Sequence, residues 1–317
     1  WLFLRLYLVP RSTFNSPQEL VNASILKLYA FSGNLVIKLI TPPIASDPYS
    51  VDAGPFITSI CLIKDCGISI DNGKDQLKAA ARNFPMEVFF LRNGDIPQYM
   101  RDGVVDIAIL GENLLIEKGN DLEVVEKLGF SKCRVSIAVP KGIKFSGIND
   151  LEGKQIATSY PNTVKSFLKK NQINANIHII NGSVEIAPNI GLADAICDIV
   201  SSGSTLFKNG LKEIEVLLTS EAVLAVSPKI SEERMAILNK IQFRIQSVLK
   251  GRNSKYILLN APNNKLDTIL KLLPGMRSPT VLPLAEEGWS SVHTVISKNQ
   301  FWEGICFVHF LPLSFLL

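Results

Sequence analysis

The chain has 317 residues, of which 47% are hydrophobic, enough for two or three domains with apolar cores. Its 33 basic and 29 acidic residues leave a net charge of +4, a small surplus without the basic runs that bind nucleic acid, so no nucleic-acid partner is expected. The five cysteines are scattered and form no Cys-x-x-Cys pair, which favours a reduced, cytoplasmic protein over a disulfide scaffold or a zinc site.

Residues 1–57 show no regular pattern of apolar positions. Pro42, Pro43 and Pro48 interrupt the chain, and neither helical nor strand periodicity persists. The apolar start, Trp1–Pro10, resembles a targeting segment, but no small-residue cleavage site follows it and no apolar run reaches the roughly 18 residues of a membrane span. We therefore expect a poorly ordered or foreign segment and no membrane partner.

From Ile60 onward, short apolar strands alternate with amphipathic helices, which is typical of α/β proteins. Ser231–Lys250 carries apolar residues at the spacing of one buried stripe, which predicts a long helix. Two series of elements predict a first lobe of residues 58–130 plus 228–252 and a second lobe of residues 131–227. The other predicted elements are strands at Met86–Leu91, Val105–Leu110, Cys133–Pro140, Gln155–Thr158 and Ile177–Ile180, and helices at Ile96–Arg101 and Thr163–Lys170.

After Gly251 the order of elements changes to β-α-β-β-α, which lacks one strand of a ferredoxin-like unit. Cys306–Leu317 stands where that strand belongs and is nearly all apolar. We expect residues 253–317 to form a small α+β domain that is incomplete. The predicted strands are Tyr256–Leu259, Thr280–Leu284 and Ser291–Ile296, with helices at Lys265–Leu273 and from about Asn299.

A phosphate-binding loop is predicted after the strand Ala195–Val200. Ser201–Thr205 is rich in hydroxyls around one glycine, so backbone N–H groups can approach a phosphate and the hydroxyls add donors. Asp198, just before the loop, would repel a bare phosphate but can accept hydrogen bonds from sugar hydroxyls. A sugar phosphate therefore fits better than inorganic phosphate. The alternative, from the loop alone, is a serine-rich turn that Asp198 caps.

Glu185–Leu206 matches the pattern Glu-x5-Gly-x-small-x2-Ile/Val-x-Asp-aliphatic-x2-Ser/Thr-Gly-x-Thr-Leu/Met at every specified position. This pattern resembles the signature of the ATP phosphoribosyltransferase family in its long form. The similarity extends from about Cys66 to Glu303. It runs through Leu91–Pro97, Ala108–Asn113, Lys132–Arg134, Ala157–Pro161, Arg244–Val248, Leu273–Gly275 and Ser278–Pro283.

The resemblance implies an α/β fold with a two-lobed, periplasmic-binding-protein-like (type II) catalytic half and a small ferredoxin-like (ACT-like) regulatory domain. It implies a transferase that condenses ATP with 5-phosphoribosyl 1-pyrophosphate to give 1-(5-phosphoribosyl)-ATP and pyrophosphate, the first step of histidine biosynthesis. Mg²⁺ is expected through the substrate phosphates, with no metal site built by the protein alone. Histidine is the expected feedback inhibitor, and dimers that associate into hexamers are the expected assembly.

The resemblance also implies roles for the residues of the signature. Asp198 and the loop bind the ribose and its 5-phosphate, and Asp194 supports the loop or the ribose as a second catalytic carboxylate. For Glu185 a binding role and the ordering of the preceding turn remain equal alternatives. The loop residues are Ser201, Ser202, Gly203, Ser204 and Thr205.

Three other turns follow predicted strands, where ligands of open α/β sheets gather. Gly111 and Glu112 open one helix, and Ser159 and Tyr160 open another, so the N–H groups of both helices can meet an anion or simply be capped. The resemblance implies that both turns line the nucleotide site, with Tyr160 against a base or ribose. Arg92, after a further strand, is a third candidate for substrate binding.

The N-terminal end departs from the family pattern. Family members begin with a strand and a Lys-x-Gly-Arg-Leu-like loop whose cations are expected to hold pyrophosphate, whereas Asp47–Ile60 contains no lysine or arginine. Gly304–Leu317 also looks unrelated to the family. A non-catalytic, two-lobed ligand-binding or regulatory protein is therefore the alternative hypothesis.

Overall fold

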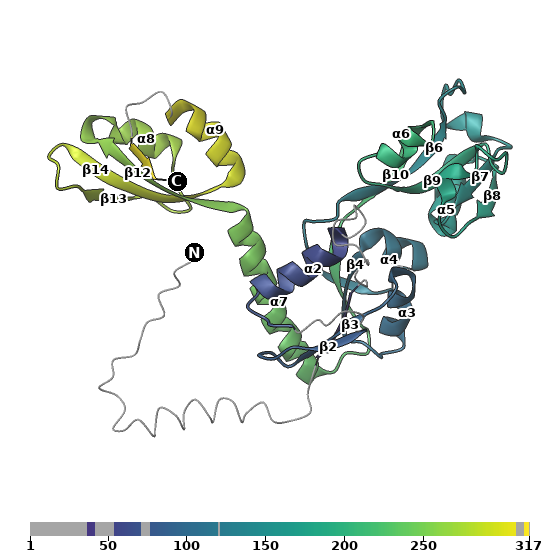
Figure 1. The fold of residues 1–317 in the computed structure, drawn as a ribbon, viewed down its shortest axis with the longest axis horizontal. Helices are drawn as coiled ribbons and strands as arrows, with labels where there is room; N and C mark the ends of the chain where they lie inside the picture. Colours follow the sequence, from purple (N-terminus) through teal and green to yellow (C-terminus); the bar gives the residue numbers. More distant parts are fainter. Residues whose placement is uncertain (1–36, 42–53, 71–76, 120, 309–313, 317) are drawn as a thin grey trace. The chain divides into compact units, whose positions relative to one another are not determined.

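A computed structural model describes residues 37–41, 54–70, 77–119, 121–308 and 314–316 (Figure 1). The chain divides into two compact units. The first comprises the chain up to Ile60 together with Gly67–Asn239, and the second comprises Cys61–Cys66 together with Lys240–Leu317. The helices α2 (Gly54–Asp65) and α7 (Glu232–Arg252) each contribute to both units. In the described part of the chain, no helix is long and apolar enough to cross a membrane.

The first unit begins with a six-stranded sheet in the order β2-β3-β1-β4-β11-β5. β1 runs parallel to β3 and β4, and β11 is antiparallel to β4 and β5. Met100, Leu115 and Val223 belong to a fully buried cluster on this sheet. The elements are β1 (Ile37–Thr41), β2 (Lys78–Ala80), β3 (Met86–Phe90), the 3-10 turn Asn93–Asp95, α3 (Ile96–Arg101), β4 (Ile107–Gly111), α4 (Glu112–Lys118), β5 (Glu123–Lys127) and β11 (Ala222–Val226).

The prediction for residues 1–57 is wrong at Ile37–Thr41, because β1 lies in the middle of the first sheet between β3 and β4. Leu39 is 1% exposed. A central parallel strand is buried on both faces, so its sequence is usually a continuous apolar run. In β1 this run is interrupted by Lys38, and the segment therefore lacks the usual pattern of a buried strand. The start of α2 at Gly54 also falls in this range. The other residues up to position 53 lie outside the described chain.

A second sheet follows, in the order β10-β6-β9-β7-β8. β7 is parallel to β8 and β9, whereas β6 is antiparallel to β9 and β10. Val135, Ile156 and Val164 are fully buried in its core. The elements are β6 (Cys133–Pro140), the 3-10 turn Ile148–Leu151, β7 (Gln155–Thr158), α5 (Pro161–Asn171), β8 (Asn176–Ile179), the 3-10 turn Val184–Ile186, β9 (Ala195–Val200), α6 (Ser204–Lys208) and β10 (Leu211–Ser220).

The chain crosses between the two sheets twice, and the crossings are hydrogen-bonded to each other. The Leu128 N–H donates to the Ala222 carbonyl at 2.9 Å, and the Ala222 N–H donates to the Phe130 carbonyl at 2.9 Å. The predicted second lobe, residues 131–227, therefore extends too far, since β11 pairs with β4 in the first sheet. Its sequence, Ala-Val-Leu-Ala-Val, is apolar throughout and carries no signal for which sheet it joins.

The second unit contains a four-stranded antiparallel sheet in the order β13-β14-β12-β15. With helices between β12 and β13 and between β14 and β15, this is the ferredoxin-like order β-α-β-β-α-β. Ile269 of α8 and Phe301 of α9 pack on Leu259 and Val292 of the sheet. The elements are β12 (Ser254–Pro262), the 3-10 turn Asn263–Lys265, α8 (Leu266–Leu272), β13 (Thr280–Pro283), β14 (Trp289–Ser297), α9 (Lys298–Val308) and β15 (Ser314–Leu316).

The prediction of an incomplete C-terminal domain is wrong. β15 supplies the fourth strand and pairs with β12 through Leu258–Asn260. Apolar and polar residues do not alternate in Cys306–Leu317, so the sequence does not show whether this segment forms a strand or an unpaired tail. Its strand partner lies more than fifty residues earlier in the chain, which local patterns cannot reveal.

Candidate functional site

The loop after β9 forms a tight turn with exposed hydroxyl groups. The Ser202 hydroxyl donates to the Ser204 hydroxyl at 3.1 Å, and the Ser204 N–H donates to Ser202 Oγ at 3.4 Å. Gly203 has a φ of +78°, a left-handed conformation that glycine adopts at little cost. Ser201, Ser202, Ser204 and Thr205 are all exposed. The turn therefore offers several hydroxyls to a ligand.

Asp198 lies next to the turn after β7, because β7 and β9 are parallel and end at the same edge of the sheet. Its Oδ1 accepts hydrogen bonds from the Ser159 hydroxyl at 3.2 Å and the Ile199 N–H at 2.8 Å. Burial raises the pKa of the Asp198 carboxyl, and the negative charge of the half-buried Glu185 adds to this effect. The structure thus places Ser159 against Asp198, and Glu185 close enough for its charge to act on the Asp198 carboxyl.

Tyr160, the residue after Ser159, also belongs to this group. The Asn113 side-chain amide of α4 donates to the Tyr160 hydroxyl at 2.8 Å. Burial raises the pKa of Tyr160 to about 12, and the nearby Asp198 carboxylate acts in the same direction. Tyr160 is therefore a neutral phenol at physiological pH. Gly111 makes room for Asn113, because a Cβ on Gly111 would collide with Asn113 Oδ1.

Arg134 and Glu213 brace the loop from the neighbouring strands, although sequence patterns identified neither as a site residue. The Arg134 guanidinium donates twice to the Glu213 carboxylate, and its Nη1 donates to the Ser201 carbonyl at 3.1 Å. The Ser136 hydroxyl donates to Glu213 at 2.8 Å. Glu213 on β10 is directly opposite Ala138 rather than Arg134, so the strand register does not point to this ion pair.

The predicted anion sites at the starts of α4 and α5 are filled by the protein itself. The N–H groups of Glu112 and Asn113 donate to the Glu221 carbonyl at 3.0 Å and the Ser220 hydroxyl at 2.9 Å. At α5, the N–H groups of Asn162 and Thr163 each donate to the Glu117 carboxylate at 2.9 Å. Free N–H groups at helix starts need partners when buried, and here distant segments supply them. Of the two alternatives that the sequence left open for these helix starts, the structure shows capping by the protein at the N–H groups of Glu112, Asn113, Asn162 and Thr163.

Asp194 lies away from the loop, contrary to the prediction. It precedes β9, whereas Ser201 follows that strand, so the two are about 20 Å apart at ~3.3 Å per residue. Asp194 Oδ2 accepts a hydrogen bond from the Gln155 N–H at 2.9 Å, and its own N–H donates to the Gln155 carbonyl at 2.9 Å. Asp194 therefore fastens the start of β9 to the start of β7.

The remaining candidates lie on the first sheet. Glu112 forms an ion pair with Lys127 at 3.1 Å. Arg92 is exposed just after β3, and Gly111 ends β4. Because β3 and β4 are both parallel to β1, Arg92 and Gly111 lie at the same edge of the sheet.

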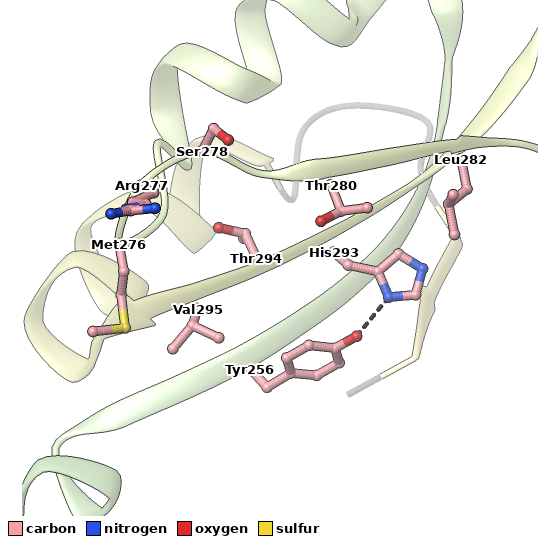
Figure 2. Close-up of a pocket in the computed structure, with 9 residues that line it drawn as sticks. All are labelled: Tyr256, Met276, Arg277, Ser278, Thr280, Leu282, His293, Thr294 and Val295. Atoms are coloured by element: carbon pink, nitrogen blue, oxygen red, sulfur yellow. Dashed lines mark hydrogen bonds between the residues drawn. The ribbon is translucent and has the colours of Figure 1, made fainter. Parts of the chain in front are cut away.

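A second candidate site lies in the ferredoxin-like sheet (Figure 2). Tyr256 and His293 point toward each other from β12 and β14, with Tyr256 Oη 2.5 Å from His293 Nδ1. Ser291 Oγ lies 3.1 Å from His293 Nε2. Thr294 Oγ1 is buried and has no hydrogen-bond partner among the residues that the structure describes. Tyr256, His293 and Thr294 border a pocket of about 480 Å³ that is also lined by Met276, Arg277, Ser278, Thr280, Leu282 and Val295.

The donor set around Asp198 determines which metal ions it suits. Within the described residues, no group of three or more His, Cys, Asp or Glu side chains could hold a metal ion. Mg²⁺ commonly uses only one or two protein carboxylates and takes its other ligands from substrate phosphates and water. Asp198 and Glu185 fit an ion that arrives with a phosphorylated substrate.

Family models match two consecutive parts of the chain. The model described as "ATP phosphoribosyltransferase" (HisG) matches residues 92–247, and the model described as "HisG, C-terminal domain" matches residues 251–306. In the solved "ATP phosphoribosyl transferase (HisG:HisZ) complex from Thermotoga maritima", one chain is similar with a TM-score of 0.57 and 24% identity, covering 68% of this chain and 100% of that one. This likeness confirms the predicted two-lobed fold.

Two curated relatives are much closer in sequence, and both are called "ATP phosphoribosyltransferase". The protein from Cytophaga hutchinsonii is 57% identical over 245 residues, covering 77% of this chain and 86% of the relative. The protein from Phocaeicola vulgatus is 52% identical over 250 residues, covering 79% and 88%. With this identity over most of both chains, and with the C-terminal domain present, the chain belongs to the ATP phosphoribosyltransferase family in its long form.

Proposed function

We propose that this chain condenses ATP with 5-phosphoribosyl 1-pyrophosphate to give 1-(5-phosphoribosyl)-ATP and pyrophosphate, the first step of histidine biosynthesis. The observation that carries the proposal is the position of Asp198 directly before the hydroxyl-rich loop, in a chain that belongs to this family. The alternative of a non-catalytic binding protein is not favoured, because curated enzymes of this name are 57% and 52% identical.

In the proposed complex, the loop Ser201–Thr205 binds the 5-phosphate through its hydroxyls and N–H groups. Asp198 accepts hydrogen bonds from the ribose hydroxyls, a role that uses a carboxylate placed beside a phosphate site. The bond from Arg134 to the Ser201 carbonyl supports the loop in this conformation. Bracing of this kind raises affinity by reducing the freedom lost on binding.

ATP is proposed to lie against Ser159 and Tyr160, beside Asp198. A ring nitrogen of ATP attacks the anomeric carbon of the ribose, a C–N bond forms, and the C–O bond to pyrophosphate breaks. The nitrogen supplies the electron pair and pyrophosphate leaves with the pair from the broken bond, so orientation matters more than a protein base. Holding two reactants in line can lower a barrier by about 7–11 kcal/mol.

Mg²⁺ is proposed to accompany the pyrophosphate group, where it would offset the negative charge of the leaving group. Glu185 and Asp198 are the carboxylates proposed to lie closest to it. Arg92, at the edge of the first sheet, is proposed to face the substrate phosphates.

The test is product formation by the purified full chain. ATP, phosphoribosyl pyrophosphate and Mg²⁺ are incubated with the protein, and phosphoribosyl-ATP is detected by mass spectrometry together with pyrophosphate release. We expect both products in equal amounts. A folded protein that binds phosphoribosyl pyrophosphate in a calorimeter but forms neither product would instead support the non-catalytic alternative.

Histidine is proposed to inhibit the enzyme from the pocket in the ferredoxin-like sheet (Figure 2). Its volume of about 480 Å³ lies in the usual range of small-molecule sites. Arg277 offers a cation for a carboxylate, and the Thr294 hydroxyl has no partner in the described part of the protein. We expect histidine to inhibit the wild type and to inhibit Arg277→Ala less, with equal uninhibited rates. Equal inhibition of both proteins would contradict this assignment.

The assembly and location are also proposals. We propose dimers that associate into hexamers in the cytoplasm, in keeping with the family's long form. Light scattering of the purified chain tests the mass, and fractionation of the source cells tests the location.

A further inference from the structure

Glu117 is a buried carboxylate on α4 whose partners lie in the first turn of α5. It is 4% exposed. Its Oε1 accepts a hydrogen bond from the Asn162 N–H at 2.9 Å, and its Oε2 accepts from the Thr163 N–H at 2.9 Å and the Thr163 hydroxyl at 2.8 Å. The Asn162 side-chain amide donates to the Glu117 carbonyl at 2.9 Å. Four hydrogen bonds therefore join a helix of the first lobe to a helix of the second.

This arrangement suits a carboxylate better than an amide. In the described part of the chain, no lysine or arginine forms an ion pair with Glu117. The start of α5 carries partial positive charge, and its first N–H groups have no partner within the helix, so they can balance the buried negative charge of Glu117. Both carboxylate oxygens accept, whereas a glutamine would turn an NH₂ group toward one of these donors.

Asn113 holds the same segment from a second point. It lies four residues before Glu117 on α4, so the two side chains share one helix face. Asn113 Nδ2 donates to the Tyr160 hydroxyl, and Asn113 Oδ1 accepts from the Ser220 hydroxyl at 2.9 Å. Tyr160 and Thr163 are thus both fastened to α4. Ser159, next to Tyr160, donates in turn to Asp198.

We propose that Glu117 is a positioning residue for the reaction, an inference that rests on the proposed function. Through the first turn of α5 it holds Ser159 and Tyr160 in place beside Asp198, so that ATP and the ribose are aligned across the two lobes. In the described part of the chain, no hydrogen bond joins the loop Ser201–Thr205 to Glu117, Asn162 or Thr163, so the affinity for phosphoribosyl pyrophosphate should depend less on Glu117. Removing the carboxylate should lower kcat far more than it raises the KM for phosphoribosyl pyrophosphate.

The experiment compares Glu117→Gln with Glu123→Gln, the same change at an exposed site of the first lobe. We expect Glu117→Gln to lower kcat by about tenfold or more, because alignment is lost, while the KM for phosphoribosyl pyrophosphate changes by less than about threefold. Glu123→Gln should match the wild type. Thr163→Val, which removes only one of the four bonds, should lower kcat by a smaller factor.

Hydrogen exchange provides a second arm that does not depend on activity. Mass spectrometry should show faster amide exchange at Asn162 and Thr163 in Glu117→Gln than in the wild type. Unchanged exchange, or unchanged kcat in an active and folded variant, would overturn the proposal, as would an activity loss explained entirely by unfolded protein. If the wild type forms no product, the proposed function fails, whereas the exchange result still decides whether Glu117 holds the start of α5.

Discussion

Arg134 and Glu213 form a two-point ion pair between neighbouring strands of the second sheet, and the third nitrogen of Arg134 binds the Ser201 carbonyl. Both Glu213 oxygens accept from the guanidinium, a planar match that lysine cannot reproduce. The hydrogen bonds from Arg134 hold the pKa of Glu213 below its ordinary value. The pair thereby connects strands β6 and β10 to the loop Ser201–Thr205.

The affinity of the loop Ser201–Thr205 for phosphoribosyl pyrophosphate should fall when the hydrogen bonds of Arg134 are broken. In Arg134→Lys the bond to Ser201 and one bond to Glu213 are lost, so we expect the KM for phosphoribosyl pyrophosphate to rise by roughly three- to tenfold, as for the loss of one to two hydrogen bonds. Steady-state kinetics measures this change. An unchanged KM in a folded variant would show that the loop does not depend on Arg134.

The same pair predicts a pH dependence of stability. Because the pKa of Glu213 is lower in the folded state than in the unfolded state, the pair stabilises the fold at neutral pH, and this contribution is lost as the pH falls through the folded-state pKa. Glu213→Gln should therefore lower the urea midpoint at about pH 7 and have little effect at about pH 3. An equal loss at both pH values would contradict the ionic origin.

Asp198 and Asp194 make a matched pair, since Asp198 lies within β9 near the loop and Asp194 directly precedes the start of the same strand. We expect Asp198→Asn to lower kcat/KM by about 100-fold, on the scale of two charged hydrogen bonds to the ribose, and Asp194→Asn to stay within about threefold of the wild type. Because burial raises the pKa of Asp198, its charge costs stability at neutral pH, and Asp198→Asn should unfold at a higher temperature. Equal loss of activity in both variants would contradict the placement of Asp194.

β1 should be essential to the first lobe, although its sequence does not show it. Leu39 is 1% exposed between β3 and β4, so Leu39→Ala should reduce the free energy of unfolding by about 2–5 kcal/mol. Leu77, 65% exposed, provides the control, because Leu77→Ala should change it by less than about 0.5 kcal/mol. Denaturant titration measures the free energy of unfolding of both variants. An equal decrease in the two would argue against β1 as a central strand.

The segment that follows β1, residues 42–53, contains no lysine or arginine. Replacing it with a Lys-x-Gly-Arg-Leu-like segment should raise kcat/KM for phosphoribosyl pyrophosphate by about tenfold, if added cations stabilise the leaving group. The matched graft carries glutamine at the two cationic positions and should give no gain. Equal rates for both grafts would show that cations from this segment do not limit the reaction.

Sequence patterns predicted the parts of the fold that have strong local signals. The helix Ile96–Arg101 and the strands Cys133–Pro140, Gln155–Thr158 and Ala195–Val200 have the predicted bounds. β1 and β15 were missed because neither alternates and each is defined by partners far along the chain. Their existence depends on pairing, which a local pattern does not contain.

The residues of the candidate site also fall into two groups, those that local sequence predicts and those whose roles depend on distant partners. The loop and Asp198 are adjacent in sequence, so the pattern of that one segment selects them together. Ser159 could be placed near Asp198 because parallel strands end at the same edge of a sheet, and its hydroxyl donates to Asp198. The roles of Glu117 and Glu213 depend on partners 46 and 79 residues away. An acidic residue in a helix or strand has the same local sequence whether it faces water or a distant helix start, so neither role was predicted.

The most direct test of the central claim is calorimetric titration with phosphoribosyl pyrophosphate in the presence of Mg²⁺. If Asp198 and the adjoining loop bind the ribose 5-phosphate, the wild type and Asp194→Ala will show saturable binding of similar strength, and a folded Asp198→Ala protein will show at least about tenfold weaker binding. Undiminished binding by folded Asp198→Ala would contradict the claim.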